Sequence, residues 1–194
     1  MIIHGKYLKA LALLAPKKEL GRPHLVGVHI EVKGSQAILV ATDGAVLGAL
    51  RVTLTEDFET HAFTIPLSLL TMITAKDEVT VTHTKAEQGP GAVTLIQGDR
   101  ILTGKAVEGT YPDYRRVIPT EVSGLQERLI FLHDLDKVAK ACTLINSAPI
   151  RAVHVYHNGG NACPVDTRNE NFMVVISPAK LEFAQSYTRP AWLS

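Results

Sequence analysis

Apolar positions along the chain group into three similar blocks, each of which predicts a short strand, a break and a helix. The strands are expected over 1–3, 62–65 and 129–132, the breaks at His4-Gly5, Pro66 and His133-Asp134, and the helices over 6–14, 67–74 and 135–145. Pro66 suits the first position of a helix and Asp134 suits an N-cap, whereas Gly5 is only a fair cap. The second and third breaks therefore have a clearer physical cause than the first.

Strand signals follow each predicted helix. Val28, Ile30 and Val32 alternate with polar neighbours, which is the period of a half-buried strand. Gly34-Ser35 predicts a hairpin turn, as do 87–91, 98–99 and 158–161. The strands are expected over 25–32, 37–41 and 45–54, then 78–83, 92–96 and 100–107, then 151–157, 162–166 and 172–176. A strand-helix-three-strand unit repeated at roughly sixty residues predicts an α+β fold whose helices cover antiparallel sheets.

The composition is that of a globular protein, with 46% hydrophobic and 20% charged residues among 194. A net charge of +1 gives no overall field that would attract nucleic acid, so any DNA contact has to come from local basic faces. The sequence contains no apolar run of transmembrane length, and its first residues lack the basic start of a signal peptide. We therefore expect a cytoplasmic protein without a membrane partner. Cys142 and Cys163 lack metal-type spacing and are expected as free thiols, Cys142 as a small core residue.

Catalytic motifs are absent from the sequence. It contains no GxxxxGK phosphate loop, no GxSxG and no HExxH. His154 and His157 stand three apart on a predicted strand and so point to opposite faces, which does not favour a metal site. Asp43 is most simply a turn residue beside Gly44. We expect no cofactor, no metal and no enzyme, and an enzyme using Asp43 and the histidines is a remote alternative.

The stretch from Glu108 to Pro119 reads as a shaped connector, because Pro112 fixes one backbone angle and Gly109 relaxes another. Its two tyrosines and paired arginines have two interpretations. Either they contact a partner, or the aromatic side chains pack on the edge of the preceding domain.

Two stretches resemble a known family. Tyr111-Pro-Asp-Tyr-Arg-Arg-Val-Ile-Pro119 is similar to the segment that leaves the middle domain of bacterial sliding clamps, the beta subunit of DNA polymerase III. Leu39-Val-Ala-Thr-Asp-Gly-Ala-Val-Leu47 is a second match, in the family's order and at about its spacing. The resemblance implies the sliding-clamp fold, built from the repeated unit at two units per domain, and a role as a processivity factor in DNA replication.

The resemblance also implies a shortened domain organisation. Residues 1–119 resemble the complete middle domain, and 120–181 carry one further unit that resembles part of the last domain. The register of 133–165 fits either half of that last domain. Residues 182–194 form a C-terminal tail whose Phe183, Tyr187 and Trp192 either dock on a surface or extend freely.

In this family a pocket between the middle and last domains captures short peptides from DNA polymerase and other proteins that carry a clamp-binding motif. Carried over by motif, Thr42, Gly44, Ala45, Val46 and Leu47 form one wall, Pro112 and Val117 lie beneath, and Val174, Val175, Ile176 and Pro178 form the other wall. Ala45-Val46 stand where the family usually has a basic or aromatic pair, so the peptide preference is expected to differ. The alternative interpretation is that these residues are the core of a strand pair.

Contact with duplex DNA would be independent of base sequence and made by lysine and arginine side chains to phosphates. The candidates are Lys17, Lys18, Arg22 and His24 in a basic loop that matches the family's DNA-facing loop, with Lys6 and Lys9 on the first helix and Lys137 and Lys140 on the third. The alternative is an ordinary solvated polar face.

Two functions are consistent with these features. The first is a sliding-clamp-like replication or repair factor that forms a homo-oligomer around duplex DNA and tethers polymerase or other partners through the apolar pocket. The second is a peptide-binding relative that does not encircle DNA and competes with or modulates the host clamp.

Overall fold

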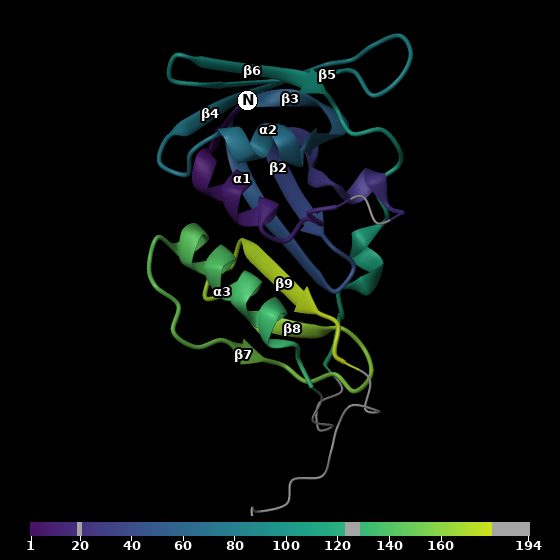
Figure 1. Ribbon diagram of the computed structural model, residues 1–194, viewed down its shortest axis with the longest axis vertical. Helices are drawn as coiled ribbons and strands as arrows, with labels where there is room; N and C mark the ends of the chain where they lie inside the picture. The colour runs from purple at the N-terminus through teal and green to yellow at the C-terminus, as the bar shows by residue number, and fades with distance from the viewer. Residues whose placement is uncertain (19–20, 123–128, 180–194) are drawn as a thin grey trace, which may run out of the picture.

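The computed structural model describes residues 1–18, 21–122 and 129–179 (Figure 1). The aromatic residues of the predicted tail lie outside this range. The elements are β1 (Ile2–His4), α1 (Gly5–Ala12), the 3₁₀ turn η1 (Pro23–Leu25), β2 (Gly27–Thr42), β3 (Val46–Pro66), α2 (Leu67–Met72), β4 (Glu78–Thr84), β5 (Ala92–Gln97), β6 (Arg100–Lys105), the 3₁₀ turn η2 (Tyr114–Val117), α3 (Leu132–Asn146), β7 (His154–Val155), β8 (Cys163–Asp166) and β9 (Phe172–Ile176).

Two antiparallel sheets carry these strands, which confirms the predicted α+β class. One sheet has the order β1-β4-β5-β6, and the other has the order β2-β3-β9-β8-β7. Strand β9 pairs with β3, with Leu47 opposite Val175, and α3 packs on α1. The third sequence block therefore extends the sheet of the first block (Figure 1). The domain boundary at 119/120 stays a prediction.

The predicted turn at Gly34-Ser35 is wrong, because the chain runs through it as one strand. β2 is 16 residues long and pairs with the 21-residue β3, and the register shifts on both sides of Gly34. Gly34 has a φ of 58° and lies opposite Phe58, so its conformational freedom serves a β-bulge here. The hairpin turn between β2 and β3 lies between Thr42 and Val46, where Asp43 was predicted as a turn residue.

Three helix starts also differ from expectation. His4 caps α1, since its Nδ1 accepts a hydrogen bond from Lys6 N at 3.3 Å. Pro66 is the N-cap of α2, one position before the helix that it was predicted to begin. Helix α3 begins at Leu132, and 129–132 form no strand among the described residues. Asp134, predicted as an N-cap, lies in the first turn and is fully buried, and its carboxylate pairs with the partly exposed Lys137.

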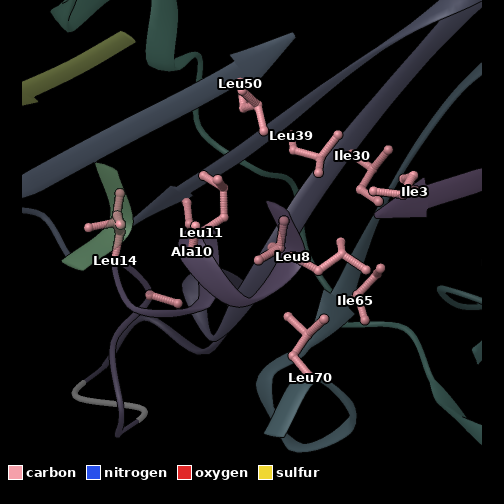
Figure 2. Packing of buried hydrophobic residues seen from close by; sticks show 14 of the residues in the cluster. Ile3, Leu8, Ala10, Leu11, Leu14, Ile30, Leu39, Leu50, Ile65 and Leu70 are labelled. Atoms are coloured by element: carbon pink, nitrogen blue, oxygen red, sulfur yellow. The ribbon is translucent and has the colours of Figure 1, made fainter. Parts of the chain in front are cut away.

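One hydrophobic core joins all three blocks. Leu8 and Leu11 of α1 pack toward Leu39 and other strand residues, and Leu14, which follows the helix, belongs to the same core (Figure 2). Residues of α3, β8 and β9 belong to the same core, namely Val138, Ala141, Cys142, Ile145, Val165, Phe172, Val174 and Ile176. Cys142 is thus the small core residue that its sequence context predicts. Within the described part of the chain, no helix has the length and apolarity needed to cross a membrane.

Candidate functional site

The tip of the β2–β3 hairpin is a tightly bonded turn centred on Asp43. The Oδ1 atom of Asp43 accepts hydrogen bonds from Ala45 N at 3.0 Å and from Val46 N at 2.9 Å. The Oγ1 atom of Thr42 donates to Val46 O at 2.8 Å and accepts from Gly44 N at 3.0 Å. Gly44 has a φ of 96°, which few side-chain-bearing residues tolerate. Asp43 is therefore a turn residue, as predicted.

Residues from the third block hold this hairpin tip in place. Lys137 Nζ on α3 lies 2.6 Å from Asp43 Oδ2, and Ser177 N donates to Ala45 O at 2.7 Å. Burial alone would raise the pKa of Asp43. The hydrogen bonds from Lys137, Val46 and Ala45 outweigh burial, and together they hold the pKa of Asp43 below its ordinary value. The turn is therefore fixed to both α3 and the end of β9.

The connector 108–119 docks on β2 through its aromatic and basic side chains. The hydroxyl of Tyr114 donates to Glu31 Oε2 at 3.2 Å, and Arg115 forms an ion pair with the same carboxylate. The Arg115 guanidinium lies 4.5 Å from the centre of the Tyr114 ring, which adds a cation–π contact. Hydrogen bonding from Arg115 is the main cause that lowers the pKa of Glu31. Of the two sequence interpretations, packing on the domain edge is the one observed for Tyr114, which is 4% exposed.

Tyr111 packs on the same edge. Its ring stacks on that of His29, with 4.3 Å between the ring centres and 5° between the planes. Nδ1 of His29 lies 2.9 Å from Thr64 Oγ1. The connector is therefore anchored to the sheet at Tyr111 and Tyr114. These anchors set the positions of Pro112, which lies between them in the chain, and of Val117, which follows them.

A hollow of about 240 Å³ lies where the hairpin tip, the connector and β9 meet. Of the predicted pocket residues, Thr42, Gly44, Ala45, Val46, Leu47, Pro112, Val117 and Val175 line it. The lining also includes residues that the sequence analysis did not assign to the pocket: Arg22, Leu25, Asp113, Tyr114, Ala162 and Ser177. Most of the residues that line the hollow are apolar, and its charged members Arg22 and Asp113 are exposed. The hollow can therefore accept an apolar group and offers one charge of each sign at its surface.

The remaining predicted pocket residues lie elsewhere. Val174 and Ile176 are fully buried in the main core, whereas Val175 packs with Leu47 and Tyr114 in a second, smaller cluster. Successive residues of β9 thus face opposite sides of the sheet. Pro178 follows the strand and does not line the hollow. Because 172–176 are all apolar, their sequence gave no indication of which face each residue takes.

The helix lysines predicted to contact DNA have partners within the fold. Lys6 Nζ donates to Ser147 Oγ at 2.8 Å, and Lys9 Nζ donates to Leu70 O at 3.2 Å. Lys140 pairs with Asp136 at 2.6 Å, and Lys137 pairs with Asp43 and Asp134. In the basic loop, Lys17, Lys18 and Arg22 are exposed and His24 is half-buried. The loop therefore presents its cations more freely than the helices do.

The described residues contain no group of three or more His, Cys, Asp or Glu side chains arranged to hold a metal ion. Both carboxylate oxygens of Asp43 are already bonded within the fold.

Acidification from pH 7 to pH 5 is expected to weaken the fold by about 2 kcal/mol through His29 alone. Burial lowers the pKa of His29 from 6.5 to about 4. The unfolded chain therefore takes up this proton near pH 6.5 and the folded chain only near pH 4, so stability falls as the pH drops through this window. Urea unfolding at both pH values checks this, with His29→Gln as the comparison. Equal losses in the two proteins would contradict the assignment to His29.

Comparisons with known proteins find relatives of this chain in one family. The family model described as DNA polymerase III beta subunit, central domain, matches residues 8–113. The beta sliding clamp of Haemophilus influenzae is 27% identical over 110 residues, which are 55% of this chain and 29% of that protein. The beta sliding clamp of Escherichia coli K12 is 30% identical over 102 residues, which are 50% of this chain and 27% of that protein. The aligned part thus spans less than a third of each of these relatives.

Solved structures extend the likeness in fold. The beta subunit of DNA polymerase III from Thermotoga maritima has a TM-score of 0.70 at 15% identity, over 93% of this chain and 65% of that chain. A Pseudomonas aeruginosa sliding clamp bound to griselimycin has a TM-score of 0.68 at 16% identity, also over 93% of this chain and 65% of that chain. The family match covers more than half of the residues and includes the hairpin that forms one wall of the hollow. The chain therefore belongs to the DNA polymerase III beta subunit family, the sliding clamps.

Proposed function

We propose that this protein captures short peptides from DNA replication or repair proteins in the pocket between the hairpin tip, the connector and β9. The observation that carries the proposal is the convergence of three segments, far apart in sequence, on one apolar hollow. The segments are those that the family resemblance indicated. Membership of the clamp family also agrees with the expectation of a protein that is not an enzyme.

The physics of the pocket suits an apolar peptide anchor. Burying apolar surface stabilises a complex by about 25 cal/mol per Å², less the cost of ordering the groups involved. The hairpin tip is already fixed by Asp43, Lys137 and Ser177, so little of it has to be ordered on binding. Ala45 and Val46 add apolar surface where the family usually has basic or aromatic side chains. We therefore expect this pocket to prefer an anchor of two large apolar side chains over a mixed polar one.

Fluorescence anisotropy with a labelled hexapeptide ending in Leu-Phe tests this function. Saturable binding with a Kd of about 1 μM, corresponding to about −8 kcal/mol, is the expected result. The control is a hexapeptide with the same first four residues that ends in Ser-Asp, which should not saturate in the same range. The proposal would be overturned if both peptides bound equally well or if neither peptide bound.

Assembly into a ring around duplex DNA is the second candidate function. The exposed Lys17, Lys18 and Arg22 favour it, because exposed cations can contact phosphates and release the counterions bound to DNA. The paired state of the helix lysines weighs against it, since part of the hydrogen-bonding capacity of each ammonium is already used within the fold.

Light scattering with and without a nicked circular plasmid separates the two functions. An oligomer that stays on the circle and is released when the plasmid is linearised would support encirclement. A monomer that does not bind DNA but binds the Leu-Phe peptide would leave peptide binding without encirclement as the function.

A further inference from the structure

Lys137 lies at the centre of a charged cluster beside the pocket. Its ammonium is 2.6 Å from Asp43 Oδ2 and 3.1 Å from Asp134 Oδ1. Asp134 is fully buried, and its Oδ1 also lies 3.1 Å from His133 Nε2. The Oδ2 atom of Asp134 is buried and has no hydrogen-bond partner among the described residues. A lysine with two carboxylates at bonding distance is poorly suited to contact a DNA phosphate, because two of its three N–H donors are in use and the two carboxylates repel the phosphate.

The two oxygens of Asp43 serve different elements. Oδ1 accepts the hydrogen bonds of Ala45 N and Val46 N and so shapes the turn. Oδ2 receives Lys137 of α3 and so fixes that turn to the third block. Ala45 and Val46 line the pocket, whereas Lys137 does not. One carboxylate therefore connects α3 to the pocket wall through the backbone of the hairpin tip.

From this geometry we infer that Lys137 is a positioning residue for the peptide pocket, holding the hairpin tip in its binding shape without touching the peptide. The inference rests on the proposed function. Its physical basis is preorganisation: a wall that is fixed before binding does not lose conformational freedom when the peptide arrives. Without the ammonium, the tip keeps its internal turn bonds and the bond from Ser177 N to Ala45 O, but it loses the connection to α3.

Two variants remove this connection in different ways. Lys137→Met removes the ammonium but leaves the buried Asp134 without it, so this variant risks a loss of stability. Asp43→Asn keeps an oxygen for the turn N–H groups and places an amide donor opposite Lys137, while the Lys137–Asp134 pair stays intact. The matched control is Lys140→Met on the same helix, whose lysine is largely exposed and pairs with Asp136.

The measurement is the Kd of the labelled Leu-Phe hexapeptide, taken after circular dichroism has shown each variant to be folded. Lys137→Met and Asp43→Asn should each weaken binding about tenfold, and Lys140→Met less than twofold. The double variant should be no weaker than either single one, because both break the same connection.

The outcomes separate this inference from the proposed function. If the wild type binds the peptide and both Lys137→Met and Asp43→Asn bind it equally well, Lys137 is not a positioning residue and the peptide-binding function stands. Additive losses in the double variant would also overturn the inference, because the two residues would then act independently. If the wild type does not bind the peptide, both proposals fail.

Discussion

A Gly5→Ala variant is expected to lose about 3 kcal/mol or more of its free energy of unfolding. A Cβ atom at position 5 would lie 2.2 Å from Thr74 O and 2.8 Å from Asp77 O, which are both backbone atoms. Neither can retreat easily, because Gly5 N already donates to Asp77 O at 2.8 Å and draws the two segments together. The added methyl group therefore has to separate α1 from the loop before β4, and this loosens the packing of the core around Leu8.

Urea unfolding followed by circular dichroism measures this loss. Gly160→Ala is the matched control, since a Cβ atom there meets no atom within 4 Å and its φ lies outside the left-handed region. That variant should stay within about 0.5 kcal/mol of the wild type. Equal stability of the two variants would show that α1 does not approach the loop as closely as described.

A Val117→Glu variant is expected to weaken binding of the Leu-Phe peptide by more than about 100-fold, or roughly 3 kcal/mol. Val117 lines the pocket and is 51% exposed in the free protein, so the fold should tolerate the change. In the complex, the variant loses apolar contact and in addition leaves a carboxylate with little water around it. Both effects act only when the peptide is bound, which is why affinity should fall far more than stability.

Anisotropy titration checks this result, with Arg116→Gln as the control. This substitution lies next in the connector and changes the net charge by the same amount, but Arg116 does not line the pocket. The control should bind within about twofold of the wild type, because an exposed charge outside the pocket lining contributes little. Unchanged affinity in Val117→Glu would place the peptide elsewhere on the protein.

Much of the fold could be predicted because local patterns carry information about burial. The strands after the second helix were expected over 78–83, 92–96 and 100–107, close to the observed β4, β5 and β6. Alternating side chains and glycine-containing turns specify such hairpins within a few residues. The turn at the hairpin tip could likewise be predicted from Asp43 and Gly44, because an Asx side chain and a positive φ act on the adjacent backbone.

Positions with two compatible local structures were decided by the tertiary structure. Gly34 suits a hairpin turn and a β-bulge equally well, and pairing with the long β3 selected the bulge. Asp134 suits an N-cap, yet it is buried beside Lys137 in the first turn of α3. In both cases the deciding contact comes from the surrounding packing, and the residues next in sequence do not reveal it.

The sequence by itself determined the α+β class, the shaped connector and the residues of the hairpin tip. Only the tertiary structure decided that Val175 faces the pocket while Val174 and Ile176 face the core, and that Lys137 bonds to Asp43, 94 residues away. The reason is physical: periodicity and turn chemistry act over a few neighbouring residues, whereas the face of an all-apolar strand and the partner of a charged side chain depend on which distant segment packs against it.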